Sequence, residues 1–109
     1  MAGITEQDVE RAVDYLRDTA ESTAIARATR VYVEEFRKSI KAQIMKEHAS
    51  MPVSAQEREA YADARYLEHL DALRAAVFDE QKALFLREAA SAKLEAYRTQ
   101  SANYRGIRV

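Results

Sequence analysis

The sequence contains almost none of the residues that interrupt regular helices. Its two glycines, Gly3 and Gly106, lie at the ends of the 109-residue chain, and its one proline, Pro52, lies near the middle. A sheet protein needs glycine, proline or similar turn residues wherever the chain reverses. The chain is instead rich in Ala, Glu, Arg, Lys and Leu, which favour helix. The sequence therefore predicts an all-α fold.

Pro52 marks the one clear reversal of the chain, because it lacks a donor and disfavours helix at Met51. We therefore expect an antiparallel hairpin of two long helices, folded as a single helical domain over residues 1–109. The expected segments are a first long helix over 6–47, a turn over 48–54, a second helical segment over 55–102 and a flexible tail over 103–109.

Capping signals define where these helices begin. Thr5 with Asp8 predicts a capping box at the start of the first helix. Ser54 with Glu57 predicts another after the turn. Asp63 is a further possible cap, so residues 55–62 are expected to form a short extra helix.

The apolar side chains of the first long helix change sides along its length. Val9, Ala12, Val13, Leu16 and Ala20 form one stripe, and Ile25, Tyr32, Val33, Phe36, Ile40 and Ile44 form another on nearly the opposite side. Two alternatives fit this change. The helix is kinked near residues 19–25, where Thr19, Ser22 and Thr23 offer competing hydrogen bonds, or one continuous helix buries its halves against different neighbours. The lack of Gly and Pro favours the continuous helix.

The second long helix has an apolar face too broad for one neighbour. One edge contains Tyr66, Leu70, Leu73, Val77 and Leu84, and the other contains Leu67, Phe78, Phe85, Ala89, Ala92 and Ala96. A single neighbouring helix covers an arc of about 100°, and a bare two-helix hairpin is marginally stable. We therefore expect a homodimer that forms a four-helix bundle or, alternatively, an interlocked antiparallel pair.

Charge alternates along the chain in four blocks. Residues 1–26 carry six acids and two bases, 27–47 three acids and six bases, 57–80 seven acids and three bases, and 81–109 two acids and six bases. Folding back near Pro52 brings each acidic block beside a basic one, and this complementarity selects orientation. The net charge of −1 argues against strong non-specific affinity for nucleic acid.

No side-chain pattern in the sequence indicates catalysis. The chain has no Cys, which excludes disulfides, thiolate metal sites and a cysteine nucleophile. Its two histidines, His48 and His69, lack the spacing of helical zinc ligands, and we expect His69 on the hydrated side of its helix. Neither a nucleophile elbow nor a phosphate loop occurs. We therefore predict a protein that is not an enzyme, with no catalytic residue, no cofactor and no metal site.

The sequence also indicates in which cellular compartment the protein is located. Its apolar runs are far shorter than a membrane span. The N-terminal residues MAGITEQDVERA are acidic and have no apolar core, unlike a secretory signal. We expect a cytoplasmic protein without membrane contact.

The stretch EAYRTQSANYRGIRV at the C-terminus combines tyrosines with arginines. We define the C-terminal Tyr/Arg face as Lys93, Tyr97, Arg98, Gln100, Tyr104 and Arg105. Rings and bases of this kind can stack on and pair with single-stranded nucleic acid. Tyrosine is also common in protein interfaces, and the acidic N-terminal block provides a counter-charge for the arginines. The second interpretation, a protein contact, is favoured, and nucleic-acid binding stays open as an alternative.

Two segments, VYVEEFRKSIKAQIMKEHASMPVSAQEREAYADARYLEHL and KLEAYRTQSANYRGIRV, together cover about half the chain. They resemble short, uncharacterised helical proteins of temperate tailed phages and prophages. The resemblance implies a bacterial host cytoplasm, a setting near phage DNA recombination or replication, and a phage or host protein as partner. It implies no catalytic or binding residue. Our leading hypothesis is a homo-oligomeric helical protein-interaction module, and a virion assembly or scaffolding factor is a further alternative.

Overall fold

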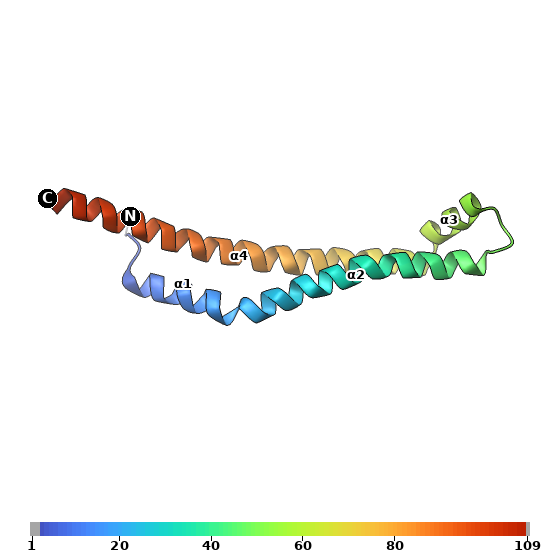
Figure 1. Ribbon diagram of the computed structural model, residues 1–109, viewed down its shortest axis with the longest axis horizontal. Helices are drawn as coiled ribbons and strands as arrows, with labels where there is room; N and C mark the ends of the chain where they lie inside the picture. The colour runs from blue at the N-terminus through green and yellow to red at the C-terminus, as the bar shows by residue number, and fades with distance from the viewer. Residues whose placement is uncertain (1–2, 109) are drawn as a thin grey trace. The chain divides into compact units, whose positions relative to one another are not determined.

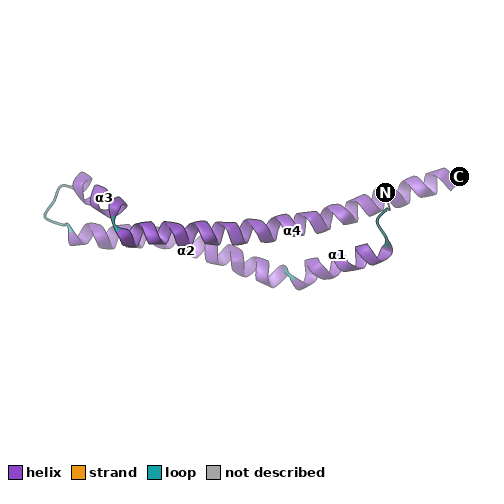
Figure 2. Ribbon diagram, turned by 180° about the vertical axis from the view of Figure 1, so that it is seen from behind, coloured by secondary structure: helices purple, strands orange, loops and turns teal. Residues whose placement is uncertain are grey.

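The computed structural model describes residues 3–108, and in that range it consists of helices joined by short connections (Figures 1 and 2). The helices are α1 (Glu6–Asp18), α2 (Ala20–Glu47), α3 (Val53–Ala62) and α4 (Ala64–Arg108). Residues 3–108 contain no strand. The long helices α2 and α4 pack against each other in opposite directions. The all-α class and the antiparallel hairpin are thereby confirmed.

The chain divides into two compact units. One contains Met1–Ala24 and Gln81–Val109, and the other contains Ile25–Glu80. The first unit therefore combines the acidic N-terminal block with the basic C-terminal block, and the second combines the two middle blocks. Each acidic block shares a unit with a basic block, as the charge pattern predicts.

The start of α1 has the predicted capping box. The Thr5 hydroxyl accepts a hydrogen bond of 3.1 Å from the Asp8 backbone N–H, and the Asp8 carboxylate accepts one of 2.9 Å from the Thr5 backbone N–H. The bond from the Thr5 backbone, with a contribution from the Thr5 side chain, lowers the pKa of the Asp8 carboxyl. The reciprocal bonds satisfy two donors that the first helical turn leaves free.

A break at Thr19 separates α1 from α2, so the alternative of one continuous helix over residues 6–47 is wrong. Thr19 is the C-cap of α1, and its hydroxyl donates to the Tyr15 carbonyl at 2.6 Å. The hydroxyls of Ser22 and Thr23 in turn donate to the Thr19 carbonyl, at 3.1 and 2.7 Å. Three side-chain hydroxyls thus compete with the backbone hydrogen bonds at this point, which is how Ser and Thr can bend helices that contain no proline.

The turn after α2 ends at a different residue from the one predicted, because the next helix starts earlier. Helix α3 begins at Val53, with Pro52 as N-cap and no side-chain capping bond, so the predicted Ser54 cap is wrong. The Pro52 carbonyl accepts backbone hydrogen bonds of 3.0 Å from both Ala55 and Gln56 and so starts the helix itself. The short extra helix near residues 55–62 is present and begins two residues earlier than predicted.

Asp63 lies between α3 and α4 and caps the longer helix. Its carboxylate accepts a 2.8 Å hydrogen bond from the Arg65 backbone N–H, and the Arg65 guanidinium also binds it at 2.9 Å. The side-chain bonds from Arg65, followed by the backbone bond, lower the pKa of Asp63 to about 2. The possible cap at this residue is therefore confirmed.

The core of the Ile25–Glu80 unit lies where the three helices meet. Ile44 of α2, Ala60 of α3 and Tyr66 of α4 are buried together. His69 is partly buried, because its Nε2 atom lies against the Val33 carbonyl and its ring against Phe36. The expectation that His69 faces water is wrong, since the ring uses a backbone carbonyl of α2 as its polar partner.

The other unit packs α1 on the later part of α4 through small side chains. Ala12 and Ala90 are buried, with 4% and 7% of their surfaces exposed. Small residues at such positions allow two helices to approach closely.

Helix α4 continues past the predicted end at residue 102. It runs to Arg108, so residues 103–108 of the predicted flexible tail are helical, and Val109 lies outside the described residues. Gly106 does not adopt the left-handed conformation with which glycine commonly ends a helix. Without that conformation, no signal between Ala102 and Arg108 stops the helix.

Candidate interaction surface

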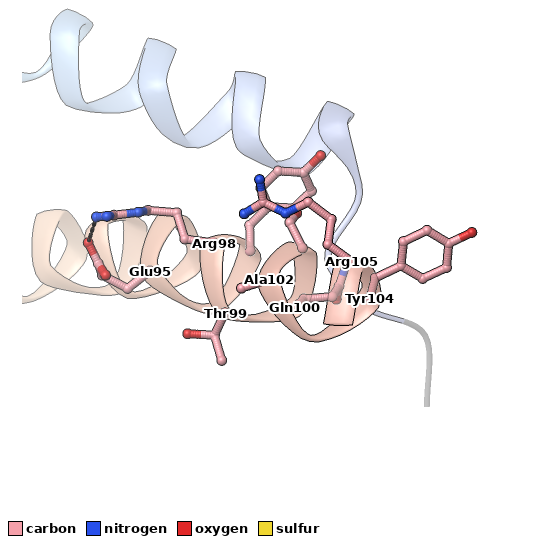
Figure 3. A pocket seen from close by; sticks show the side chains of 9 residues that line it. Glu95, Arg98, Thr99, Gln100, Ala102, Tyr104 and Arg105 are labelled. Atoms are coloured by element: carbon pink, nitrogen blue, oxygen red, sulfur yellow. Dashed lines mark hydrogen bonds and ion pairs between the residues drawn. The ribbon is translucent and has the colours of Figure 1, made fainter. Parts of the chain in front are cut away.

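The C-terminal Tyr/Arg face lies on the last turns of α4. Five of its six residues line one broad, open concavity of about 950 Å³, together with Glu95, Thr99, Ser101 and Ala102 (Figure 3). The five are Tyr97, Arg98, Gln100, Tyr104 and Arg105. The helical spacing therefore brings most of the predicted face together on one surface.

Gln100 holds the segment before α1 against α4. Its side-chain oxygen accepts a 2.9 Å hydrogen bond from the Ile4 backbone N–H, and its side-chain nitrogen donates a 2.8 Å bond to the Ile4 carbonyl. A methyl group on Gly3 would lie 2.4 Å from the Gln100 oxygen, so only glycine permits this approach without moving the amide. Gln100 is therefore engaged within its own unit.

The other residues of the concavity differ in how accessible they are. Tyr97 is half-buried, whereas Tyr104 is 59% exposed and its ring projects away from the helix (Figure 3). Arg98 donates a 3.0 Å hydrogen bond to Glu95, one helical turn earlier, and both side chains are largely exposed. Arg105 is also exposed. Exposed pairs such as Arg98–Glu95 are weak, so the arginines can exchange partners at little cost.

Lys93 does not share this concavity. It lines a separate hollow of about 300 Å³ where α1 faces α4, together with Arg11, Ala12, Tyr15, Leu86, Ala89 and Ala90. The predicted face is therefore split, because one residue lies beside α1 and the others lie toward the end of α4.

The structure also exposes large apolar side chains that the predicted core would bury. In the Ile25–Glu80 unit, Tyr32 is 68% exposed, Leu67 49% and Phe78 64%. In the other unit, Phe85 is 62% exposed. Leu67, Phe78 and Phe85 belong to the second edge of the broad apolar face, and the helices of one chain leave this edge uncovered. The broad apolar face of the second long helix is the sequence feature that predicts this exposed edge.

An ion pair is buried in the Ile25–Glu80 unit and was not predicted. Arg30 donates a 2.6 Å hydrogen bond from Nε to Glu80 and a second of 2.6 Å to Glu34. Glu80 is only 4% exposed. The bond from Arg30 lowers the pKa of Glu80 although burial opposes this shift, and the same contacts raise the pKa of Arg30. Arg30 and Glu80 are 50 residues apart in sequence, so no local spacing pattern indicates that they form a pair.

Two further findings concern residues 3–108. In this range, no three His, Asp or Glu side chains are grouped so as to hold a metal ion. No helix within it combines the length and the apolar character that crossing a bilayer requires.

Comparison with known proteins finds no family model, no curated protein and no solved structure that matches this chain.

Proposed function

We propose that the protein is a non-catalytic, homo-oligomeric helical module that acts by binding other proteins. The resemblance of residues 31–70 and 93–109 to phage and prophage proteins favours a phage accessory role linked to DNA recombination or replication.

The exposed apolar side chains carry this proposal. Four large apolar residues have about half or more of their surface exposed to water, namely Tyr32, Leu67, Phe78 and Phe85. Leu67 and Phe78 are 11 residues, or about three helical turns, apart on α4 and lie on the same side of it, and exposed apolar surface that is contiguous usually marks a site of protein contact. Burying one such side chain contributes roughly 1.5–3 kcal/mol, so covering several of them is a sufficient driving force for association.

The mass of the protein in solution tests the oligomer. Sedimentation equilibrium over a concentration series around the micromolar range is expected to give twice the chain mass of 12.4 kDa. A stable, compact species of 12.4 kDa throughout the series would contradict the homo-oligomeric part of the proposal.

Single-stranded nucleic-acid binding through the C-terminal Tyr/Arg face is the second candidate. It is favoured by one observation, which is that Tyr97, Arg98, Tyr104 and Arg105 line the same concavity. It ranks below the first candidate because Gln100 is engaged with Ile4 and because the net charge of the chain is −1.

A titration of labelled single-stranded DNA at low and moderate salt separates the two candidates. Binding to phosphates weakens steeply as salt rises. We expect weak or no binding. Sub-micromolar, salt-dependent binding that is abolished by Arg98→Ala with Arg105→Ala would place nucleic-acid binding first. The matched control, Lys38→Ala with Arg58→Ala, removes the same charge from exposed positions in the other unit.

A further inference from the structure

One face of α4 has two charged side chains between two apolar ones, and all of them are exposed. We define the outer α4 face as Leu67, Asp71, Arg74 and Phe78, which follow one another at intervals of four, three and four residues. This is the spacing of the contact positions of a coiled coil. All four side chains are exposed, and all four belong to the Ile25–Glu80 unit.

The outer α4 face lies away from the packed side of the helix. The packed side contains Tyr66, Ala76 and Glu80, which are all buried. A hollow of about 370 Å³ on the outer face is lined by Asp71, Arg74, Ala75, Phe78 and Asp79, all of which come from α4 itself. Neither α2 nor α3 contributes a lining residue, so a second molecule has access to this surface.

The two charges at the centre of this face are left without internal partners. Among the ion pairs of the described residues, none involves Asp71 or Arg74. An apolar partner would bury both charges unpaired, which is strongly unfavourable. The occupant that best fits this face offers a base opposite Asp71, an acid opposite Arg74 and apolar groups on either side.

A second copy of this chain meets that requirement in one arrangement. We propose that two copies associate through the outer α4 face in antiparallel orientation, with a two-fold axis between residues 72 and 73. Asp71 then faces the partner's Arg74, and Leu67 faces the partner's Phe78. The two-fold axis repeats both contacts, so the interface has two ion pairs between two apolar layers. The inference rests on the homo-oligomer proposed above and names its surface and register.

The same charges disfavour the parallel arrangement. Parallel helices in register would place Asp71 against the partner's Asp71 and Arg74 against the partner's Arg74. Like charges in contact across an interface are destabilising. Polar residues at coiled-coil contact positions are known to specify register and orientation at some cost in stability, and the Asp71–Arg74 pair has that role here.

Charge reversal tests this pairing. In a dimer of the Asp71→Arg variant, a base faces a base at each of the two central contacts. In a dimer of the Arg74→Asp variant, an acid faces an acid at each of these contacts. Each variant is expected to self-associate at least about tenfold more weakly than the original protein, because repulsion replaces attraction. An equimolar mixture of the two variants restores both ion pairs and is expected to form the mixed dimer, which native mass spectrometry distinguishes by mass.

The control is Glu59→Arg, which reverses an exposed charge on α3 and should leave association unchanged. Recovery in the mixture also excludes misfolding as the cause of weakened association. If the original protein is a dimer and the single variants dimerise equally well, or the mixture fails to recover, the register is wrong while the proposed homo-oligomer stands. If the original protein is a monomer, the homo-oligomer and the register both fail.

Discussion

Arg87 of α4 donates a hydrogen bond of 2.8 Å to the side-chain oxygen of Thr19, the residue at which α1 ends. The same guanidinium nitrogen donates a 2.6 Å bond to the Leu16 carbonyl, in the last turn of α1. Helix ends leave carbonyls without intrahelical partners, and here a side chain 71 residues away supplies the donor. The break between α1 and α2 is therefore held from the opposite helix as well as by its own hydroxyls.

Arg87→Met is expected to destabilise the fold, since it leaves a partly buried carbonyl and hydroxyl without their donor. The expected loss in free energy of unfolding is about 1–3 kcal/mol, measured by urea denaturation followed by circular dichroism at one fixed protein concentration. The control is Arg98→Met. Within residues 3–108 its guanidinium pairs only with the exposed Glu95 one turn away, and we expect a loss of about 0–1 kcal/mol. Equal losses in the two variants would show that Arg87 does not support the break.

Gln100→Leu is expected to free the segment before α1 with little effect on the rest of the molecule. The substitution removes both hydrogen bonds between the amide and the Ile4 backbone. Hydrogen exchange should become faster at Ile4 and in the first turn of α1, and the free energy of unfolding should fall by about 0.5–1.5 kcal/mol per lost bond at most.

The nearby Thr99→Ala is the control for Gln100→Leu, because Thr99 lines the same concavity (Figure 3), whereas the hydrogen bonds to the Ile4 backbone come from Gln100. Gly3→Ala should reproduce part of the Gln100→Leu effect, since its added methyl displaces the amide. Unchanged exchange at Ile4 in Gln100→Leu would show that the two hydrogen bonds do not hold this segment.

Local signals predict several parts of the fold, although they fail at Ser54, where the Pro52 carbonyl starts α3 instead. The capping box at Thr5, the reversal at Pro52 and the helical class follow from residues a few positions apart. The hydroxyls near Thr19 indicate a possible break, but no local signal marks Arg87, which is far away in sequence and donates a hydrogen bond to Thr19. Local propensity could not decide between a break and a continuous helix.

The candidate site shows the same limit. Helical spacing brings Tyr97, Arg98, Tyr104 and Arg105 onto one concavity, and this can be predicted from the sequence. The engagement of Gln100 with Ile4, 96 residues away, and the burial of Glu80 depend on which helices meet and could not be predicted. The sequence around a polar residue on a helix face does not indicate which residue it contacts in the folded protein.

Asp63 is expected to make stability fall in acid. Its folded-state pKa of about 2 lies below the ordinary value of 3.8, so its contribution is fully present above pH 3.8 and is lost as the pH falls toward 2. The free energy of unfolding of Asp63→Asn should depend less on pH over this window than that of the original protein. Glu59→Gln, at an exposed position, should leave the pH dependence unchanged. An unaltered slope in Asp63→Asn would contradict the lowered pKa.

Glu80→Gln tests whether the buried ion pair contributes to stability in a pH-dependent way. The substitution preserves the shape of the side chain and removes the charge that Arg30 binds at 2.6 Å. Because Arg30 lowers the pKa of Glu80 below its ordinary value of 4.5, the carboxylate contributes stability above pH 4.5 and loses this contribution at lower pH, as it becomes protonated in the folded state. At pH 7 the variant should therefore be less stable than the original protein.

The comparison with Glu34→Gln gives this prediction its control, since Glu34 binds the same arginine from a side chain that is 44% exposed. At pH 7 Glu80→Gln should be the more destabilised of the two variants. It removes the charge of the buried partner of Arg30, whereas Glu34→Gln removes the charge of a partner that water can reach. Urea denaturation repeated at decreasing pH should show the gap between Glu80→Gln and the original protein narrowing below pH 4.5, as the carboxyl of the original protein also becomes neutral. A gap that stays constant through this range would contradict the lowered pKa of Glu80 and the contribution of its charge to stability.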